Sequence, residues 1–217
     1  MTHDNRRADG PKRSGSRTPA ARRVALTQLT QAAQRCRDCP IGEHATQVVF
    51  GEGAVSAKIF LIGEQAGDQE DRQGHPFVGP AGRLLDQVLR ELGIDRHSIY
   101  ITNVIKHFKF ELRGKRRLHA RANAKEIAAC LQWLERELEL IKPKYIVCLG
   151  AMASKVIFGN AFSLTEQRGQ WLPLENARWG IATVHPAFVV RMKASPGYDA
   201  AYAAFVADLR MLLDLPG

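Results

Sequence analysis

Long apolar runs are missing from this chain of 217 residues. No stretch approaches the roughly 18 apolar residues of a membrane-spanning helix, which argues against an integral membrane protein. The cationic N-terminus lacks the apolar core of a secretory signal, and Asp4 and Asp9 disfavour a transit peptide, which is poor in acidic residues. We therefore expect an intracellular, cytoplasmic protein.

Cysteine and acidic residues are also scarce. The chain has 4 Cys, and in a reducing compartment we expect none of them to form a structural disulfide. Lys and Arg number 31 against 22 Asp and Glu, which gives a formal net charge of +9. That excess predicts a polyanionic partner, nucleic acid before membrane. The length and the 45% hydrophobic content predict one core in a monomeric, single-domain protein.

Residues 1–23 have almost no apolar side chains. They combine Gly, Pro and Ser with seven cations: Arg6, Arg7, Lys12, Arg13, Arg17, Arg22 and Arg23. This composition predicts a disordered basic arm, followed by a single domain over residues 24–217. Two interpretations of the arm stay open, a DNA-binding tail and a segment without function.

Short apolar runs alternate with amphipathic stretches from residue 24 onward. The runs predict strands at 58–62, 98–105, 144–149 and 180–184. The stretches predict helices at 24–35, 80–92, 123–141, 151–158 and 198–213. Fully apolar strands that alternate with helices predict an α/β fold, a three-layer α/β/α sandwich with a central, mostly parallel four-stranded sheet. There are no internal repeats.

Polar side chains stand where three of these strands end. They are Gly63-Glu64-Gln65, Asn103 and His185-Pro186. The carboxyl ends of parallel strands meet at one edge of the sheet, where α/β proteins bind their ligands. Because a core needs none of these polar groups, we expect them to converge on a functional site.

The residues around these ends resemble a known family. Residues 63–71 read Gly-Glu-Gln-Ala-Gly-Asp-Gln-Glu-Asp, and residues 74–82 read Gly-His-Pro-Phe-Val-Gly-Pro-Ala-Gly. Together they resemble the first motif of the iron–sulfur uracil-DNA glycosylases, family 4. Asn103-Val-Ile-Lys106 and His185-Pro186 stand where that family has its other motifs. The resemblance covers about residues 33–215 and implies excision of uracil from DNA, in base excision repair of DNA damage.

Two features are similar to the UdgX branch, whose loop histidine becomes covalently attached to the DNA sugar. Gln65 stands where family 4 usually has Gly or Ala, and residues 114–119 form a basic insert, Gly-Lys-Arg-Arg-Leu-His. Two positions depart from the pattern. Ala66 replaces a usual proline, and Ala187 replaces a serine that commonly follows His-Pro.

The resemblance implies roles in substrate binding for four residues. Asn103 reads the edge of a flipped-out uracil, and Phe77 offers a ring on which the base stacks. Gln65 adds a contact to the base. Asp68 positions the substrate or shapes the same pocket.

It also implies three catalytic residues. His185 donates a hydrogen bond to O2 of the departing uracil. Glu64 stabilises the cationic sugar or activates a nucleophile. His119 is that nucleophile and attacks C1′ of the sugar. The insert's three cations are expected to contact the DNA backbone: Lys115, Arg116 and Arg117.

A [4Fe–4S] cluster is the cofactor that the resemblance implies. Cys36, Cys39 and Cys130 match family positions, and His107 stands at the position of the fourth cysteine. Histidine replaces cysteine as a ligand in Rieske centres, so we prefer His107 over Cys148, which lies in an apolar strand. A zinc site is the alternative. A redox pair at Cys36 and Cys39 is disfavoured, since no thioredoxin-like strand precedes it.

The sequence thus predicts a nucleoid-associated enzyme that excises uracil from DNA and is trapped on its product through His119. Two alternatives stay open. One is a conventional uracil-DNA glycosylase that turns over, with His119 only touching phosphate. The other is an iron–sulfur module that binds DNA without catalysis.

Overall fold

The structure is a computed structural model that describes residues 18–217. Most of the predicted N-terminal arm lies outside these residues. Helix α1 (Pro19–Ala33) begins at Pro19, whereas the sequence analysis began it at Val24. The side chain of Thr18 accepts a hydrogen bond from the Ala21 N–H, and Pro19 occupies the first helical turn, so a regular N-cap explains the earlier start.

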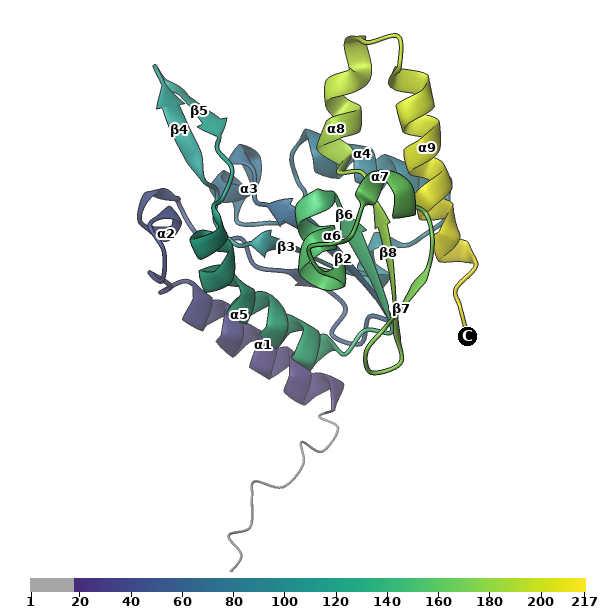
Figure 1. Ribbon diagram of the computed structural model, residues 1–217. Coiled ribbons are helices and arrows are strands. Elements are labelled where there is room, and N and C mark those ends of the chain that lie inside the picture. Colours follow the sequence, from purple (N-terminus) through teal and green to yellow (C-terminus); the bar gives the residue numbers. More distant parts are fainter. Residues whose placement is uncertain (1–17) are drawn as a thin grey trace, which may run out of the picture.

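A six-stranded sheet forms the middle layer, in the order β1-β3-β2-β6-β8-β7 (Figure 1). Its four central strands are parallel, as predicted: β3 (Tyr100–Ile105), β2 (Ile59–Gln65), β6 (Tyr145–Leu149) and β8 (Arg178–Thr183). Two short antiparallel strands, β1 (Glu52–Gly53) and β7 (Leu172–Leu174), extend the edges. The prediction missed both because strands of two and three residues are too short to show a periodic pattern.

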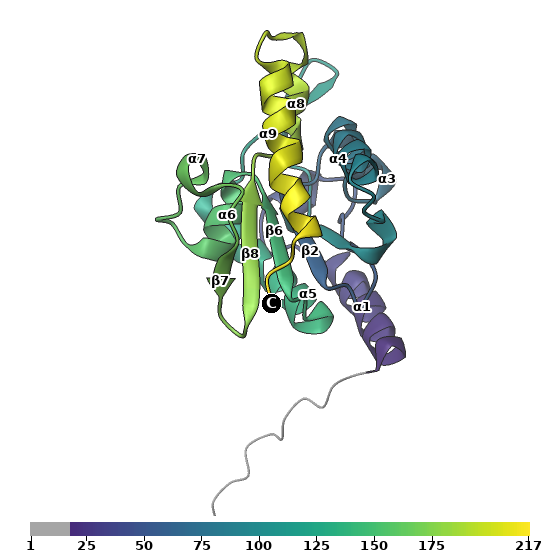
Figure 2. The same ribbon diagram turned by 90° about the vertical axis from the view of Figure 1, so that its right-hand side faces the viewer.

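Two apolar layers cover the sheet, as the alternation of buried side chains along β2 illustrates. Phe60 and Ile62 pack with one cluster and Leu61 with the other. The first cluster includes α1, α5 (Ala124–Ile141) and α6 (Ala151–Phe158). The second includes α4 (Pro80–Glu91), α8 (Pro186–Arg191) and α9 (Tyr198–Arg210) (Figure 2). The predicted three-layer sandwich is confirmed.

Short elements complete the described chain. They are α2 (Ile41–His44), α3 (Asp68–Gln73), η1 (Arg96–Ser98), α7 (Leu164–Gln167), η2 (Met192–Ala194) and η3 (Met211–Leu213). Over residues 18–217, no helix has the length and apolar character needed to cross a membrane.

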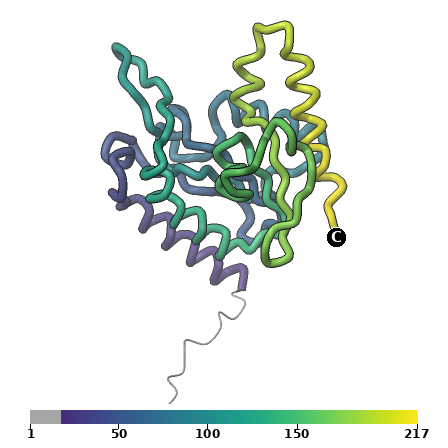
Figure 3. Tube along the Cα trace, in the orientation of Figure 1, coloured from purple at the N-terminus to yellow at the C-terminus, as the bar shows by residue number. Residues whose placement is uncertain are grey.

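The basic insert is a β-hairpin that projects from the sandwich (Figures 1 and 3). Strands β4 (Phe110–Arg113) and β5 (Arg116–His119) pair antiparallel, with Phe110 opposite His119. Gly114 has φ of 60°, which glycine adopts easily in a tight hairpin turn. The pairing of four consecutive residues on each strand gives the insert a defined register.

Candidate active site

The polar strand ends converge at one edge of the sheet, as predicted. In the parallel pairing of β2 with β3, Gly63 lies opposite Asn103. A Cβ atom at position 63 would stand 2.3 Å from Asn103 Oδ1 and 2.5 Å from Cζ of Phe77. Only glycine lets the amide and the aromatic ring approach the strand this closely, so Gly63 forms the floor of the candidate pocket.

Phe77 holds a backbone conformation that a bulky residue rarely adopts. Its φ is 57°, in the left-handed region, and its side chain is buried. Its ring stacks on the ring of His185, with centroids 6.1 Å apart. Strain of this kind costs about 1–3 kcal/mol and concentrates at functional sites. The Phe77 ring, held in this conformation, forms a flat apolar wall beside the strand ends.

Three buried polar atoms at this edge have no hydrogen-bond partner within the described chain. They are Asn103 Oδ1, His185 Nε2 and Gln65 Oε1. Buried polar atoms are nearly always paired, because leaving one unpaired costs about 1–3 kcal/mol. Three unpaired atoms around one aromatic wall indicate a site for a flat, polar ligand that supplies their partners.

His185 is a neutral hydrogen-bond donor. Its Nδ1 accepts a hydrogen bond from the Ala187 N–H at 3.1 Å, so the proton of the neutral ring lies on Nε2. Burial, with smaller electrostatic effects of Arg191 and His119, lowers the pKa of His185 to about 4. At neutral pH the ring therefore offers an N–H, without a positive charge, to the pocket.

Glu64 stands between the pocket floor and Gln65 on β2 and is partly exposed. Within residues 18–217 its carboxylate makes no ion pair, unlike the nearby acids of α3. A carboxylate that is not neutralised by a cation can stabilise positive charge or accept a proton. Both roles fit its predicted place in catalysis.

Gln65 holds the base of the hairpin. Its Nε2 donates to the carbonyl of Lys109 at 3.1 Å and to that of Ala120 at 3.5 Å. Lys109 directly precedes β4, and Ala120 directly follows β5. The sequence predicted a contact of Gln65 with the base. The amide nitrogen is instead committed to the hairpin, and only Oε1 remains free.

Arg117 points inward, which differs from its predicted contact with the DNA backbone. Its guanidinium donates to Asp68 Oδ1 and to Asp71 Oδ2, each at 2.6 Å, and lies over the rings of Phe108 and Phe110. Two carboxylates thus already neutralise it, and Asp71 is fully buried. Asp68, predicted to bind substrate, serves to anchor the hairpin. Buried charges require such partners, which explains the difference.

The rest of the insert is exposed. Lys115 and Arg116 lie at the turn and are open to solvent, as a phosphate contact requires. His119 is exposed at the other end of β5, with its ring centroid 6.3 Å from that of Phe108. It is also near enough to influence the pKa of His185. The hairpin therefore brings one imidazole to the border of the pocket.

Three of the four cysteines share one neighbourhood. Burial, with smaller effects of the neighbouring Cys39 and Cys36, raises the pKa of the Cys130 thiol to about 11, although the Lys106 N–H donates a hydrogen bond to its sulfur. All four cysteines are free thiols. These three sulfurs, brought together from α5 and from the segment before α2, form the candidate cofactor site.

His107 borders this group, and Cys148 does not. The ring of His107 and the carbonyl of Cys36 both lie next to Gly42. Burial, followed by the charge of Arg37, lowers the pKa of His107 and favours the neutral form that binds metals. Cys148 lies in the centre of the sheet, and burial alone raises its pKa.

The described residues offer no group of three or more His, Cys, Asp or Glu side chains placed to hold a single metal ion.

A buried ion pair that the sequence pattern did not predict lies behind the pocket. Lys106 Nζ donates to Glu137 Oε2, to Thr102 Oγ1 and to the carbonyl of Asn103, and both charged side chains are fully buried. The pair fastens the end of β3 to α5. Lys106 stood in the quoted Asn-Val-Ile-Lys motif, but Glu137 lies in a helix that gave no signal of its burial.

Comparisons with known proteins agree with this geometry. Residues 50–210 match the uracil DNA glycosylase superfamily. The chain is 36% identical over 168 residues to a type-4 uracil-DNA glycosylase of Thermotoga maritima, covering 77% of this chain and 84% of that protein. It is 37% identical over 174 residues to the type-4 enzyme of Archaeoglobus fulgidus, covering 76% and 83% respectively. With its strand-end pocket and these relatives, the chain belongs to the uracil-DNA glycosylase superfamily.

Proposed function

We propose that this protein is a DNA-repair enzyme that excises uracil from DNA. The observation that carries the proposal is the pair of unpaired buried atoms, Asn103 Oδ1 and His185 Nε2, beside the ring of Phe77. An acceptor, a donor and an aromatic wall match the edge and the face of one pyrimidine. Relatives named as uracil-DNA glycosylases support the same substrate.

Base recognition follows from hydrogen-bond polarity. Uracil presents N3–H as a donor and O4 as an acceptor, and an asparagine amide offers the reverse of each. Cytosine presents an unprotonated N3 and an amino group, so it would leave both Asn103 atoms facing like groups. Each buried mismatch costs about 1–3 kcal/mol, which is enough to exclude cytosine. The base must leave the helical stack to enter, and stacking on Phe77 offsets part of that cost.

Cleavage of the N-glycosidic bond places a negative charge on uracil and a positive charge on the sugar. The electron pair of the C1′–N1 bond leaves with the base, and the Nε2–H of His185 donates to O2, where part of the charge resides. Because the imidazole is neutral, it strengthens that hydrogen bond without losing a proton. The carboxylate of Glu64 stabilises the sugar cation.

His119 then captures C1′, in the finer form of the proposal. An imidazole nitrogen gives its lone pair to C1′, and the ring's other N–H proton passes to Glu64 or to solvent, which leaves a neutral N-linked adduct. The advantage over water is proximity, since effective molarities of well-oriented groups reach about 10⁵–10⁸ M. The supporting observation is that the hairpin holds an exposed imidazole near His185.

The cofactor proposed for this chain is a [4Fe–4S] cluster held by Cys36, Cys39, Cys130 and His107. When bound, it would supply a structural tie, since its ligands come from α5, from the end of β3 and from the segment before α2. The clustering of three thiols with a neutral histidine supports this ligand set. Cys148→Ala should keep the cluster's visible absorbance, and His107→Cys should keep it as well. Loss of the absorbance in Cys148→Ala alone would reverse the assignment.

One experiment separates the proposal from its alternatives. The protein is incubated with a uracil-containing oligonucleotide and then run on a denaturing gel. A heat-stable shifted band indicates the His119 adduct, and mass spectrometry of the nuclease-digested band should place the deoxyribose remnant on that residue. An abasic product without a shifted band indicates a conventional enzyme that turns over. If neither the shifted band nor the abasic product forms, only DNA binding remains, and the proposed activity is contradicted.

A further inference from the structure

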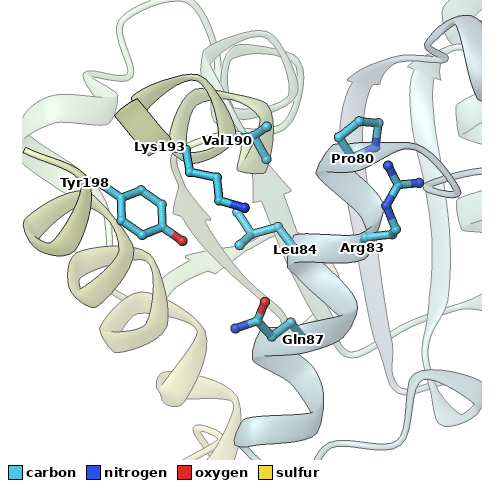
Figure 4. A pocket seen from close by; sticks show the side chains of 7 residues that line it. All are labelled: Pro80, Arg83, Leu84, Gln87, Val190, Lys193 and Tyr198. Carbon is cyan, nitrogen blue, oxygen red and sulfur yellow. The ribbon is translucent and has the colours of Figure 1, made fainter. Parts of the chain in front are cut away.

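The two layers that cover the sheet support the uracil pocket to different degrees. The layer of α4, α8 and α9 lies on the side of Phe77, and a hollow of about 250 Å³ separates α4 from the segment between α8 and α9 (Figure 4). Asn103 Oδ1 lies on this side, next to Gly63, and has no hydrogen-bond partner within the described chain. The placement of the Asn103 amide therefore depends on the backbone of β3.

The opposite face of β3 carries a network of buried polar groups. Successive side chains of a strand point to opposite faces, so Tyr100 and Thr102 face α5 while Asn103 faces the pocket. The hydroxyls of Tyr100 and Thr102 donate to the carboxylate of Glu137 at 2.8 Å and 3.0 Å. The N–H of Gly51 donates to the same carboxylate at 2.9 Å. One carboxylate of α5 thus holds both β3 and the segment that leads into β1.

Lys106 connects this network to the residue that faces uracil. Its Nζ donates to Glu137 Oε2, to Thr102 Oγ1 at 2.6 Å and to the carbonyl of Asn103 at 2.7 Å. These contacts use all three N–H groups of an ammonium. The carbonyl carbon is bonded to the Cα atom that carries the amide side chain. Holding the carbonyl therefore fixes the direction in which the Asn103 side chain leaves the strand.

The backbone of Lys106 is held as well. Its N–H donates to Cys130 Sγ at 3.3 Å, and its carbonyl accepts a hydrogen bond from the Val49 N–H at 2.7 Å. Strand β1 pairs with β3 only at Tyr100 and Ile101. Within the described chain, Lys106 and its partners thus fasten the end of β3 beyond the point where pairing with β1 stops.

Stability alone explains the ion pair poorly. Removing two charges from water costs free energy, and an apolar pair of similar volume often stabilises a protein as well or better. The side chains of Lys106 and Glu137 are both fully buried, so neither contacts DNA. What an apolar pair could not supply is the hydrogen bond to the carbonyl of Asn103.

We propose that Lys106, with Glu137 as its counter-charge, is a positioning residue that sets the Asn103 amide for its contacts with the edge of uracil, a step that rests on the proposed function. Lys106 touches neither the base nor the sugar and acts through the Asn103 carbonyl. The amide is then oriented before the base enters, so uracil binding does not have to supply the free energy of ordering it.

The test compares removal of the ion pair in the presence and in the absence of the Asn103 amide. Lys106→Met combined with Glu137→Gln replaces both charges by neutral side chains of similar size, which avoids leaving one buried charge unpaired. Single-turnover release of uracil should fall by about tenfold, the value of a hydrogen bond to a charged group. In an Asn103→Ala background, the same double substitution should change the rate by less than about twofold, because residues that act through one another are not additive.

Affinity for uracil-free DNA should stay unchanged in the double variant, since both side chains are buried. Lys109→Met combined with Glu126→Gln is the matched control, because it removes another Lys–Glu pair that involves α5 and does not contact Asn103. Uracil release by the control should stay within about twofold of wild type. Thermal unfolding of each variant establishes that it is folded.

Thr102→Val provides a second, milder variant. It removes one partner of Lys106 Nζ and leaves both charges paired. It should slow uracil release by less than the double substitution does, and its effect should also disappear in the Asn103→Ala background. If the double variant does not fold, the same comparison made with Thr102→Val decides.

The possible outcomes are distinct. Equal slowing with and without the Asn103 amide would overturn the positioning role, since the pair would then act through stability alone. An unchanged rate in the folded double variant, or an equal loss in the control, would overturn it too. Absence of uracil release by the wild type would instead overturn the proposed function.

Discussion

The uracil pocket and the β4–β5 hairpin lie next to each other but are held in different ways. The pocket's polar side chains follow the ends of parallel strands, and three of their atoms are buried and unpaired within the described chain. The hairpin is a separate two-stranded sheet that is largely exposed, and side-chain contacts at its base attach it to the sandwich. Under the proposed function, this difference corresponds to a division of labour. The strand ends would recognise the base, and the hairpin would supply the group that meets the sugar.

The largest expected effect concerns a residue of the uracil pocket. His185→Ala removes the one N–H that faces uracil O2, so single-turnover release of uracil should fall by about 10²–10³-fold, as for the loss of an oxyanion donor. Affinity for uracil-free DNA should stay unchanged. Rates within threefold of wild type would show that the leaving base does not depend on this imidazole.

The next effect separates the hairpin from the pocket. Arg117→Ala leaves the buried carboxylate of Asp71 without its partner, which should lower the free energy of unfolding by about 3 kcal/mol. The yield of DNA adduct should fall more than the rate of uracil release, because the hairpin loses its anchor while the strand ends remain in place. Both quantities are measured on the same denaturing gel.

Arg116→Ala is the matched control for that variant. Arg116 is exposed on the same strand, and its loss should change stability by no more than about 0.5 kcal/mol. A destabilisation equal to that of Arg117→Ala would contradict the anchoring role of the inward-facing arginine.

Specificity should depend on the pocket alone. Asn103→Asp replaces the amide donor by a second acceptor, which would face O4 of uracil and would suit the amino group of cytosine. Uracil release should therefore fall by about 10–100-fold, corresponding to one or two mispaired groups, while the ratio of cytosine to uracil release rises. An unchanged ratio of the two rates would remove Asn103 from base recognition.

A separate effect on stability concerns pH. Because the folded pKa of His185, about 4, lies below its ordinary value of 6.5, folding favours the neutral ring. Its contribution to stability is complete above pH 6.5 and is lost as the pH falls toward 4, by at most about 1.4 kcal/mol per pH unit. His185→Gln should flatten the dependence of unfolding free energy on pH in that window. The same slope in the variant would contradict a buried neutral ring.

Much of the fold was predictable, because the buried faces of helices and strands require apolar residues at regular spacing along the chain. Apolar runs identified the four parallel strands, and the polar residues after them identified the pocket through the geometry of strand ends. The edge strands β1 and β7 were not predicted, because they are too short and bury too few side chains to show an apolar pattern.

The hairpin shows what the sequence could not reveal. A run of cations predicts solvent or phosphate for every member, yet Arg117 is paired with Asp68 and Asp71, nearly fifty positions away. Gln65 likewise gave no sign that its amide would hold the carbonyls of Lys109 and Ala120. Such partners depend on tertiary contacts, which local pattern does not encode.

The measurement that tests the division of labour most directly is uracil release by His119→Ser. That variant keeps Asn103, His185 and Glu64 and opens space for water beside C1′. The account predicts that the heat-stable adduct disappears while uracil is still released and an abasic site remains. An adduct that persists undiminished in His119→Ser, or a loss of uracil release as deep as in His185→Ala, would contradict it.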